Sequence, residues 1–186
     1  MRLVLTRLLG LTMLLVVGWL LLSISTIPSA TTLNPIADAR DRWHAQGIRS
    51  YRIALDVEVR GKRCFQQLAV RDGLVHDIID TCDEPWLGIL TVPRIFAVAE
   101  RVSNLPQSRC FAASQICTCH RVFVERQYGF DAMTGLPELT HSRSINTYNW
   151  RHTDFWTHLM LTRDIPSCTG INRTLSIRLV AFTPEQ

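Results

Sequence analysis

The chain has 186 residues, of which 47% are hydrophobic and 19% charged, and its formal net charge is +4. Its basic residues are all arginine except Lys62, and eighteen basic and sixteen acidic residues remain once Arg2 and Arg7 at the N-terminus are set aside. This near-balance, spread without a basic block, gives no support to nucleic acid as a partner. Beyond the N-terminal segment roughly 160 residues remain, which suits one domain with a real core.

The apolar stretch Leu3–Ile24 opens the chain and contains one charge, Arg7. A helix needs about 20 mostly apolar residues to cross a bilayer, so we expect a transmembrane anchor within residues 1–25. Because Arg2 and Arg7 precede the stretch, the N-terminus is expected in the cytoplasm and the rest outside, in a periplasmic or extracellular location. The alternative is a cleaved secretory signal, with Ser23–Ser25 as the better cleavage site, which would release the domain as a secreted protein.

All six cysteines follow this stretch. An even number of cysteines in an oxidising compartment predicts up to three disulfides. The candidate residues are Cys64, Cys82, Cys110, Cys117, Cys119 and Cys168. Fifteen pairings are possible for six cysteines. Cys64 and Cys82 are the expected pair, because they flank a predicted hairpin at the outer ends of its strands.

Residues 26–34 are rich in Ser, Thr and Pro and predict a short tether, followed by a domain over residues 35–186. Asn34 and Pro35 are typical of a helix start, and Gly47 of its end. Tyr51–Val59 then alternates apolar and polar residues, which predicts a half-buried strand.

A hairpin signal follows this strand. Strands are expected at Cys64–Arg71 and Leu74–Ile79, joined by Asp72-Gly73, a typical tight-turn pair. With Tyr51–Val59 they form a predicted three-stranded antiparallel meander. Thr91–Ser103 carries an apolar stripe at helical spacing, with Thr91 as the N-cap.

The second half of the chain predicts three more strands, at Arg121–Phe130, Pro137–His141 and Leu175–Phe182. Gly135 marks the turn between the first two. Ser144–Asp164 fits helix and strand patterns equally well. The whole predicts an α+β fold in which an antiparallel sheet of about five or six strands is packed by two helices, stapled by disulfides and preceded by one transmembrane helix.

The order of these signals resembles an uncharacterised bacterial family of secreted or membrane-anchored proteins. The residues that carry the resemblance are Trp43, Tyr51, the V-R-D-G run Val70–Gly73, Ile95-Phe96, and the aromatic-Asp-x-x-x-Gly-x-Pro turn at Phe130, Asp131, Gly135 and Pro137, with Asp154 after it. The chain departs from the pattern at Leu136, where an aromatic residue is usual, and in its Cys-rich loop and last strand. The resemblance implies a small exported α+β domain of unknown function and assigns no catalytic residue.

The loop Cys110–His120 is the most chemically suggestive stretch. Its C-x-C-H run is one residue shorter than a haem attachment motif. Cys110, Cys117, Cys119 and His120 are the right residue types for zinc, and Cys117 and Cys119 for a redox-active thiol pair. The interpretation we favour is structural: two disulfides tie the loop Asn104–Cys119, one of them to Cys168.

A second cluster comprises Arg151, His152, Asp154 and His158, of which Asp154 and His158 would share a helix face. We interpret it as surface pairing rather than a metal or acid–base site. Nucleophile and phosphate-loop motifs do not occur in the sequence. We therefore assign no catalytic, cofactor or metal residues, and expect a non-enzymatic binding module or accessory subunit of a membrane complex. Its partners would be the bilayer, through Leu3–Ile24, and a protein in or near the same membrane. The alternative function is a metal-binding or thiol-redox protein that uses the Cys110–His120 loop.

Overall fold

The computed structural model describes residues 34–110, 116–168 and 172–185. The predicted anchor Leu3–Ile24 and residues 26–33 of the predicted tether lie outside these ranges. Within them, no helix has both the length and the apolar character that crossing a bilayer requires. All elements described below belong to one compact unit, Pro35–Gln186.

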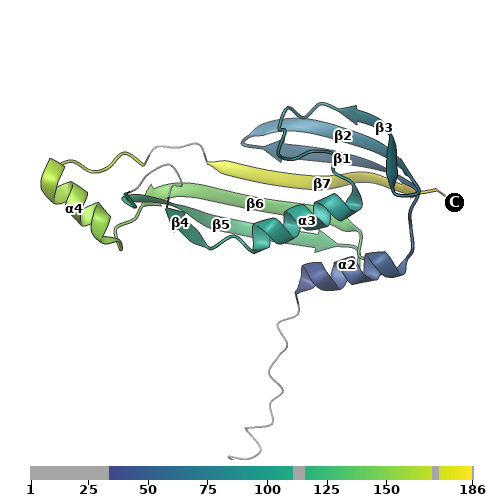
Figure 1. Cartoon of the computed structure of the whole chain (residues 1–186), viewed down its shortest axis with the longest axis horizontal. Helices are drawn as coiled ribbons and strands as arrows, with labels where there is room; N and C mark the ends of the chain where they lie inside the picture. The colour runs from purple at the N-terminus through teal and green to yellow at the C-terminus, as the bar shows by residue number, and fades with distance from the viewer. Residues whose placement is uncertain (1–33, 111–115, 169–171, 186) are drawn as a thin grey trace, which may run out of the picture. The chain divides into compact units, whose positions relative to one another are not determined.

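Seven strands form one antiparallel sheet in the spatial order β3-β2-β1-β7-β6-β5-β4 (Figure 1). The strands are β1 (Tyr51–Val59), β2 (Lys62–Arg71), β3 (Leu74–Asp80), β4 (Ser108–Cys110), β5 (Cys119–Phe130), β6 (Pro137–Tyr148) and β7 (Arg173–Pro184). The α+β class and the antiparallel sheet are therefore confirmed. The expected count of five or six strands was too low, because β4 has only three residues and lies inside the Cys-rich loop.

Three helices are present in the described residues: α2 (Pro35–Ala45), α3 (Val92–Ser103) and α4 (Thr153–Thr162). The two predicted helices, α2 and α3, are confirmed. The third arises from the stretch that fitted two patterns equally. The first residues of that stretch, from Ser144 on, extend β6 to Tyr148. Helix α4 then begins after His152, whose ring nitrogen accepts a hydrogen bond from the Asp154 N–H. Since two helices were expected, α4 corrects that count as well.

The core lies on the face of the sheet that α3 covers. Along β1, Ile53, Leu55 and Val57 are at most 1% exposed, while Arg52 and Asp56, at alternate positions, are exposed on the other face. This alternation is what a sheet covered on one side requires. α3 contributes its buried stripe to the same core and contacts both β6 and α2.

Tyr51 joins the core to the start of α3. Its ring packs against Trp43 of α2, at 6.0 Å between centroids, and against Phe182 of β7, at 5.6 Å. Its hydroxyl accepts a hydrogen bond of 3.2 Å from the Val92 N–H. Thr91 stands at the N-cap as predicted, but its side chain makes no capping bond there. The Tyr51 hydroxyl therefore satisfies the N–H of Val92, one of the first helix N–H groups that have no partner within the helix.

Gly135 holds the turn between β5 and β6 against α2. Its φ is +74°, and a Cβ at this position would lie 2.0 Å from the Ala39 carbonyl oxygen. Asp131 closes the same turn by accepting hydrogen bonds from the Thr134 hydroxyl, the Thr134 N–H and the Met133 N–H, and these bonds lower the pKa of Asp131. The predicted turn glycine is thus required twice, by its backbone angle and by the helix beside it.

Candidate functional site: a cysteine-stapled end and an arginine cavity

The six cysteines form three disulfides: Cys64–Cys82, Cys110–Cys117 and Cys119–Cys168. The first is the expected hairpin pair, with 5.0 Å between its Cα atoms. The other two tie the Cys-rich loop, one of them to Cys168, as the structural interpretation predicted. Cys117 and Cys119 belong to different disulfides, so they do not form a C-x-C redox pair with each other.

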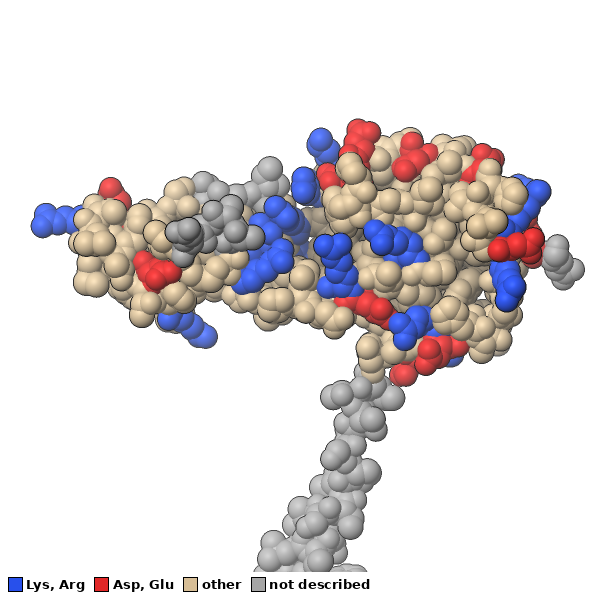
Figure 2. Space-filling view, in the orientation of Figure 1, with Lys and Arg blue, Asp and Glu red and all other residues tan. Residues whose placement is uncertain are grey.

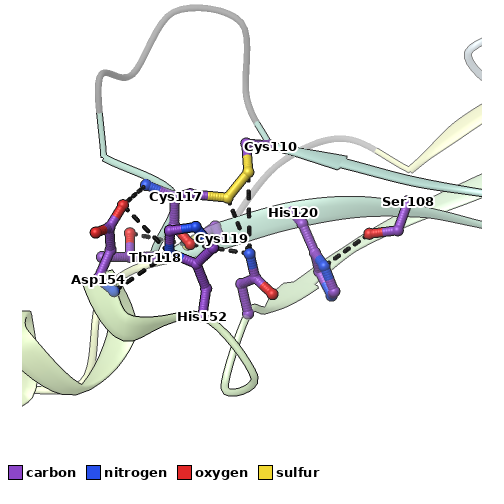
Figure 3. The surroundings of a disulfide bond; sticks show 9 residues. Ser108, Cys110, Cys117, Thr118, Cys119, His120, His152 and Asp154 are labelled. Carbon is purple, nitrogen blue, oxygen red and sulfur yellow. Dashed lines mark hydrogen bonds and ion pairs between the residues drawn. A yellow bond between two sulfur atoms is a disulfide. The ribbon is translucent and has the colours of Figure 1, made fainter. Parts of the chain in front are cut away.

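Polar contacts around Cys117 fix this end of the sheet to the residues that precede and begin α4 (Figure 3). The Asp154 carboxylate accepts a 2.6 Å hydrogen bond from the Cys117 N–H, and Asn149 donates to the Cys117 carbonyl oxygen at 3.0 Å. Asp154 also lies 3.4 Å from the His152 ring nitrogen. Asp154 therefore acts as a structural acceptor for the backbone of the disulfide loop.

The remaining candidates of the two sequence clusters are not brought together. His120 lies 2.8 Å from the Ser108 hydroxyl across the β4–β5 pair, and burial lowers the pKa of its imidazole. His158 is on α4. Across the described ranges, no group of three or more His, Cys, Asp or Glu side chains is placed to hold a metal ion.

A cavity of about 300 Å³ lies elsewhere, beneath the C-terminal half of α3. Part of its lining is apolar and largely buried: Val98 and Val102 of α3, Phe123 of β5 and Leu175 of β7 are 5–8% exposed. The hydroxyl-bearing residues Ser142 and Ser144 of β6 also line it. We call this feature the arginine cavity, for the residues described next.

Among the described residues, six arginines line this cavity, and no aspartate or glutamate does. They are Arg60, Arg94, Arg101, Arg109, Arg121 and Arg173. Arg121 is half-buried and the other five are exposed. In Figure 2, Lys and Arg side chains gather on the face that α3 covers. The cavity thus combines a buried apolar part with accessible guanidinium groups.

The fold brings these arginines together from distant parts of the chain. Arg109 of β4 and Arg121 of β5 are direct cross-strand partners, and Arg173 of β7 is the partner of Ser144 on β6. Arg94 and Arg101 are seven residues apart on α3, a spacing that puts both on one helix face. Arg60 follows directly after β1.

Arg126 fixes the geometry of the cavity without lining it. Its guanidinium donates hydrogen bonds to the Ser103 carbonyl at 3.3 Å and to the Leu105 carbonyl at 2.8 Å. It also lies 4.3 Å from the centre of the Phe123 ring. These contacts join β5 to the C-terminal end of α3, where a positive charge complements the helix dipole.

The lining of the arginine cavity carries an excess of positive charge. Burial and the neighbouring charges of Arg173, Arg109 and Arg60 lower the pKa of Arg121. Arg60 has one carboxylate neighbour, Glu84 at 3.7 Å, and Arg94 donates to the carbonyls of Leu87 and Trp86. In the part of the chain that the structure describes, Arg101, Arg109 and Arg173 form no ion pair with a carboxylate.

Sequence reasoning missed the arginine cavity because its charges are spread over more than a hundred positions and never form a block. Arg109 and Arg121 flank the Cys-rich loop, but their register across β4 and β5 sets Cys110 opposite His120, which the cysteine spacing does not indicate. Comparison of the chain with protein-family models, curated proteins and solved structures finds no match. Membership of the bacterial family that the sequence resembles therefore stays a prediction.

Proposed function

We propose that the protein is a non-enzymatic binding module that holds an anionic ligand in the arginine cavity on the extracytoplasmic side of a membrane. One observation carries the proposal: in the part of the chain that the structure describes, six arginines and no acidic residue line a partly apolar cavity. A cavity lined by one sign of charge concentrates ligands of the opposite sign. Guanidinium groups also present paired donors that match carboxylate, sulfate and phosphate oxygens.

The energetic cost of the arrangement supports a binding role. Like charges directly opposite each other in a sheet destabilise it, and Arg109 and Arg121 are such a pair. Among the described residues Arg109 forms no ion pair with a carboxylate, while Arg121 donates a hydrogen bond of 3.3 Å to the Asn146 side-chain oxygen, a neutral partner. Residues that reduce stability in this way are concentrated at functional sites, where a ligand offsets their repulsion.

The location of the module is proposed from the sequence. Leu3–Ile24 would anchor the domain in the cell membrane, and the tether of residues 26–34 would hold it within about 30 Å of the bilayer surface. The cysteine pairing supports an oxidising, extracytoplasmic compartment, because disulfides persist there. We propose further that the domain serves a membrane complex as an accessory subunit.

Ligand binding is tested with three anionic probes that share a phenyl ring: phenyl phosphate, phenyl sulfate and benzoate. Each is titrated calorimetrically into the purified full chain in detergent. We expect at least one probe to bind. The double variant Arg121→Gln/Arg173→Gln should weaken that binding by about a hundredfold, because each lost charged hydrogen bond is worth roughly tenfold or more.

The matched control is Arg143→Gln/Arg178→Gln, which removes the same charge from β6 and β7 at two exposed positions. Arg143 lies between the buried residues Ser142 and Ser144, and Arg178 follows buried Ile177, so both lie on the open face of the sheet. The control should bind the probes as the unmodified chain does. Absence of binding by all three probes, or equal losses in the two double variants, would contradict the proposal.

The accessory role is tested separately by mild detergent extraction from native membranes and mass spectrometry of what co-migrates. A stoichiometric membrane complex is the expected result, and a chain that runs alone contradicts this part. Thiol counting and metal analysis of the same sample address the alternative metal or thiol-redox function. Zinc or free thiols in the Cys110–His120 loop would favour that alternative.

A further inference from the structure

We infer that the ligand of the arginine cavity is an organic phosphate, with a phosphoryl group held by Arg60, Arg109, Arg121 and Arg173 and a compact apolar group against the wall beneath α3. This inference rests on the proposed function and names the chemical class of its ligand. Three properties of the cavity support it: its charge, its apolar part and its size.

The first property is the number of converging charges. Arg60, Arg109, Arg121 and Arg173 line one cavity, and Arg109 is the direct cross-strand partner of Arg121. Besides burial, the charges of Arg173, Arg109 and Arg60 lower the pKa of Arg121. A carboxylate or a sulfate ester brings one negative charge to this group. A phosphate monoester brings about −1.5 to −2 at pH 7 together with three strong acceptor oxygens. It therefore neutralises more of the repulsion and uses more of the guanidinium donors.

The second property is the apolar wall. Val98, Val102, Phe123 and Leu175 line the same cavity as the arginines. Inorganic phosphate would occupy the charged side and leave this wall unused. An apolar group on the ligand removes that surface from water, which favours binding in proportion to the area covered. The lining therefore fits a ligand with two chemically different ends.

The third property is size. The cavity measures about 300 Å³, at the lower end of ligand sites in proteins. An apolar cavity of about 150 Å³ accommodates benzene. The arginine cavity therefore has room for a ring-sized group and one phosphoryl group. A long acyl chain would have to lie outside it.

The test is the order of affinities for the full chain in detergent. We expect phenyl phosphate to bind about tenfold or more tightly than phenyl sulfate and benzoate, because it carries the additional charge. It should also exceed inorganic phosphate by about tenfold, because the ring is buried. Arg121→Lys keeps the positive charge but loses the paired N–H donors of the guanidinium group. It should lower the affinity for phenyl phosphate more than the affinity for benzoate.

The failures of the two proposals are distinguishable. If no probe binds, the anion-binding function itself is wrong. If the probes bind and Arg121→Gln weakens them, but phenyl sulfate or benzoate equals phenyl phosphate, only the phosphate assignment is wrong. Equal binding of phenyl phosphate and inorganic phosphate would overturn the organic part of the assignment.

A phosphoryl group could come from a soluble metabolite or from a lipid headgroup, and a second arm separates these sources. The full chain is placed in phosphatidylcholine nanodiscs with and without phosphatidic acid, and phenyl phosphate is titrated into both. If phosphatidic acid competes, the phosphate belongs to a lipid headgroup. If both titrations give the same affinity, the ligand is a soluble phosphate. Loss of phenyl phosphate binding in both kinds of nanodisc would contradict the site.

Discussion

The two ends of the sheet are built on different principles. At one end, β1, β2, α2 and the first half of α3 close an apolar core around Trp43, Leu55 and Phe96. At the other, β4, β5 and β6 frame the arginine cavity, and two disulfides hold the strand ends. The first end stabilises itself by burial. The second end carries like charges that repel one another, and two disulfides hold it together. This arrangement is expected where a binding site lowers the stability of the fold.

The polar inner face of β6 shows the same difference. Thr140, Ser142 and Ser144 are at most 5% exposed, and through β7 the first two align with Val57 and Val59 of β1. Small hydroxyl-bearing residues leave space beneath α3 that branched aliphatic residues would fill. The cavity therefore results from the residues of β6 as much as from the arginines around it.

The largest effect is expected from the long-range disulfide at the charged end. Replacing both Cys119 and Cys168 by serine should lower the free energy of unfolding by about 4 kcal/mol, because their link closes a loop of 49 residues. The same change at Cys110 and Cys117, seven residues apart, should cost only about 2 kcal/mol. Chemical denaturation of the purified variants measures both. Equal losses would show that loop closure does not govern this end.

Gly135→Ala should be the most damaging change of one residue at the apolar end. The new Cβ meets the Ala39 carbonyl in a left-handed backbone, for a loss of about 3 kcal/mol. Gly73→Ala is the matched control, since Gly73 has φ +81° but no atom within 4 Å of a new Cβ. It should cost about 1 kcal/mol. If the two glycines respond alike in denaturant titrations, the contact between the turn and α2 is wrong.

Tyr51→Phe should cost about 1 kcal/mol, because the Val92 N–H loses its hydrogen bond at the buried start of α3. Tyr128→Phe is the comparison, since the Tyr128 hydroxyl is buried without a partner among the described residues. Its removal should be neutral or slightly stabilising. Thermal unfolding of the two variants is the measurement, and a larger loss at Tyr128 would contradict these hydrogen-bond assignments.

The smallest effect has the opposite sign. Arg109→Gln should stabilise the ligand-free chain by about 0.5 kcal/mol at low ionic strength, because it removes a like charge opposite Arg121. The gain should shrink in concentrated salt, which screens exposed charges. Arg143→Gln on the open face should show no comparable gain. A loss of stability in Arg109→Gln at low salt would mean that the arginine cavity is not repulsive.

The apolar end of the sheet could be predicted from the sequence, and the end with the arginine cavity could not. Strand β1 was predicted with its bounds, since alternating burial shows directly in the spacing of Tyr51–Val59. β6 was predicted to end at His141 but reaches Tyr148, because serine and threonine on its inner face hide the alternation. The arginine cavity was not predicted at all. Its residues come from β1 and the turn after it, α3, β4, β5, β6 and β7, and only the pairing of these strands brings them to one place.

The central claim is that the arginine cavity binds an anion, and side-chain NMR tests it most directly. The Nε–Hε signals of the arginines are recorded for the full chain in detergent while phenyl phosphate is added. The account predicts saturable shifts at Arg109, Arg121 and Arg173, with Arg143 and Arg178 unchanged. Unchanged cavity signals, or shifts of the same size at Arg143 and Arg178, would contradict it.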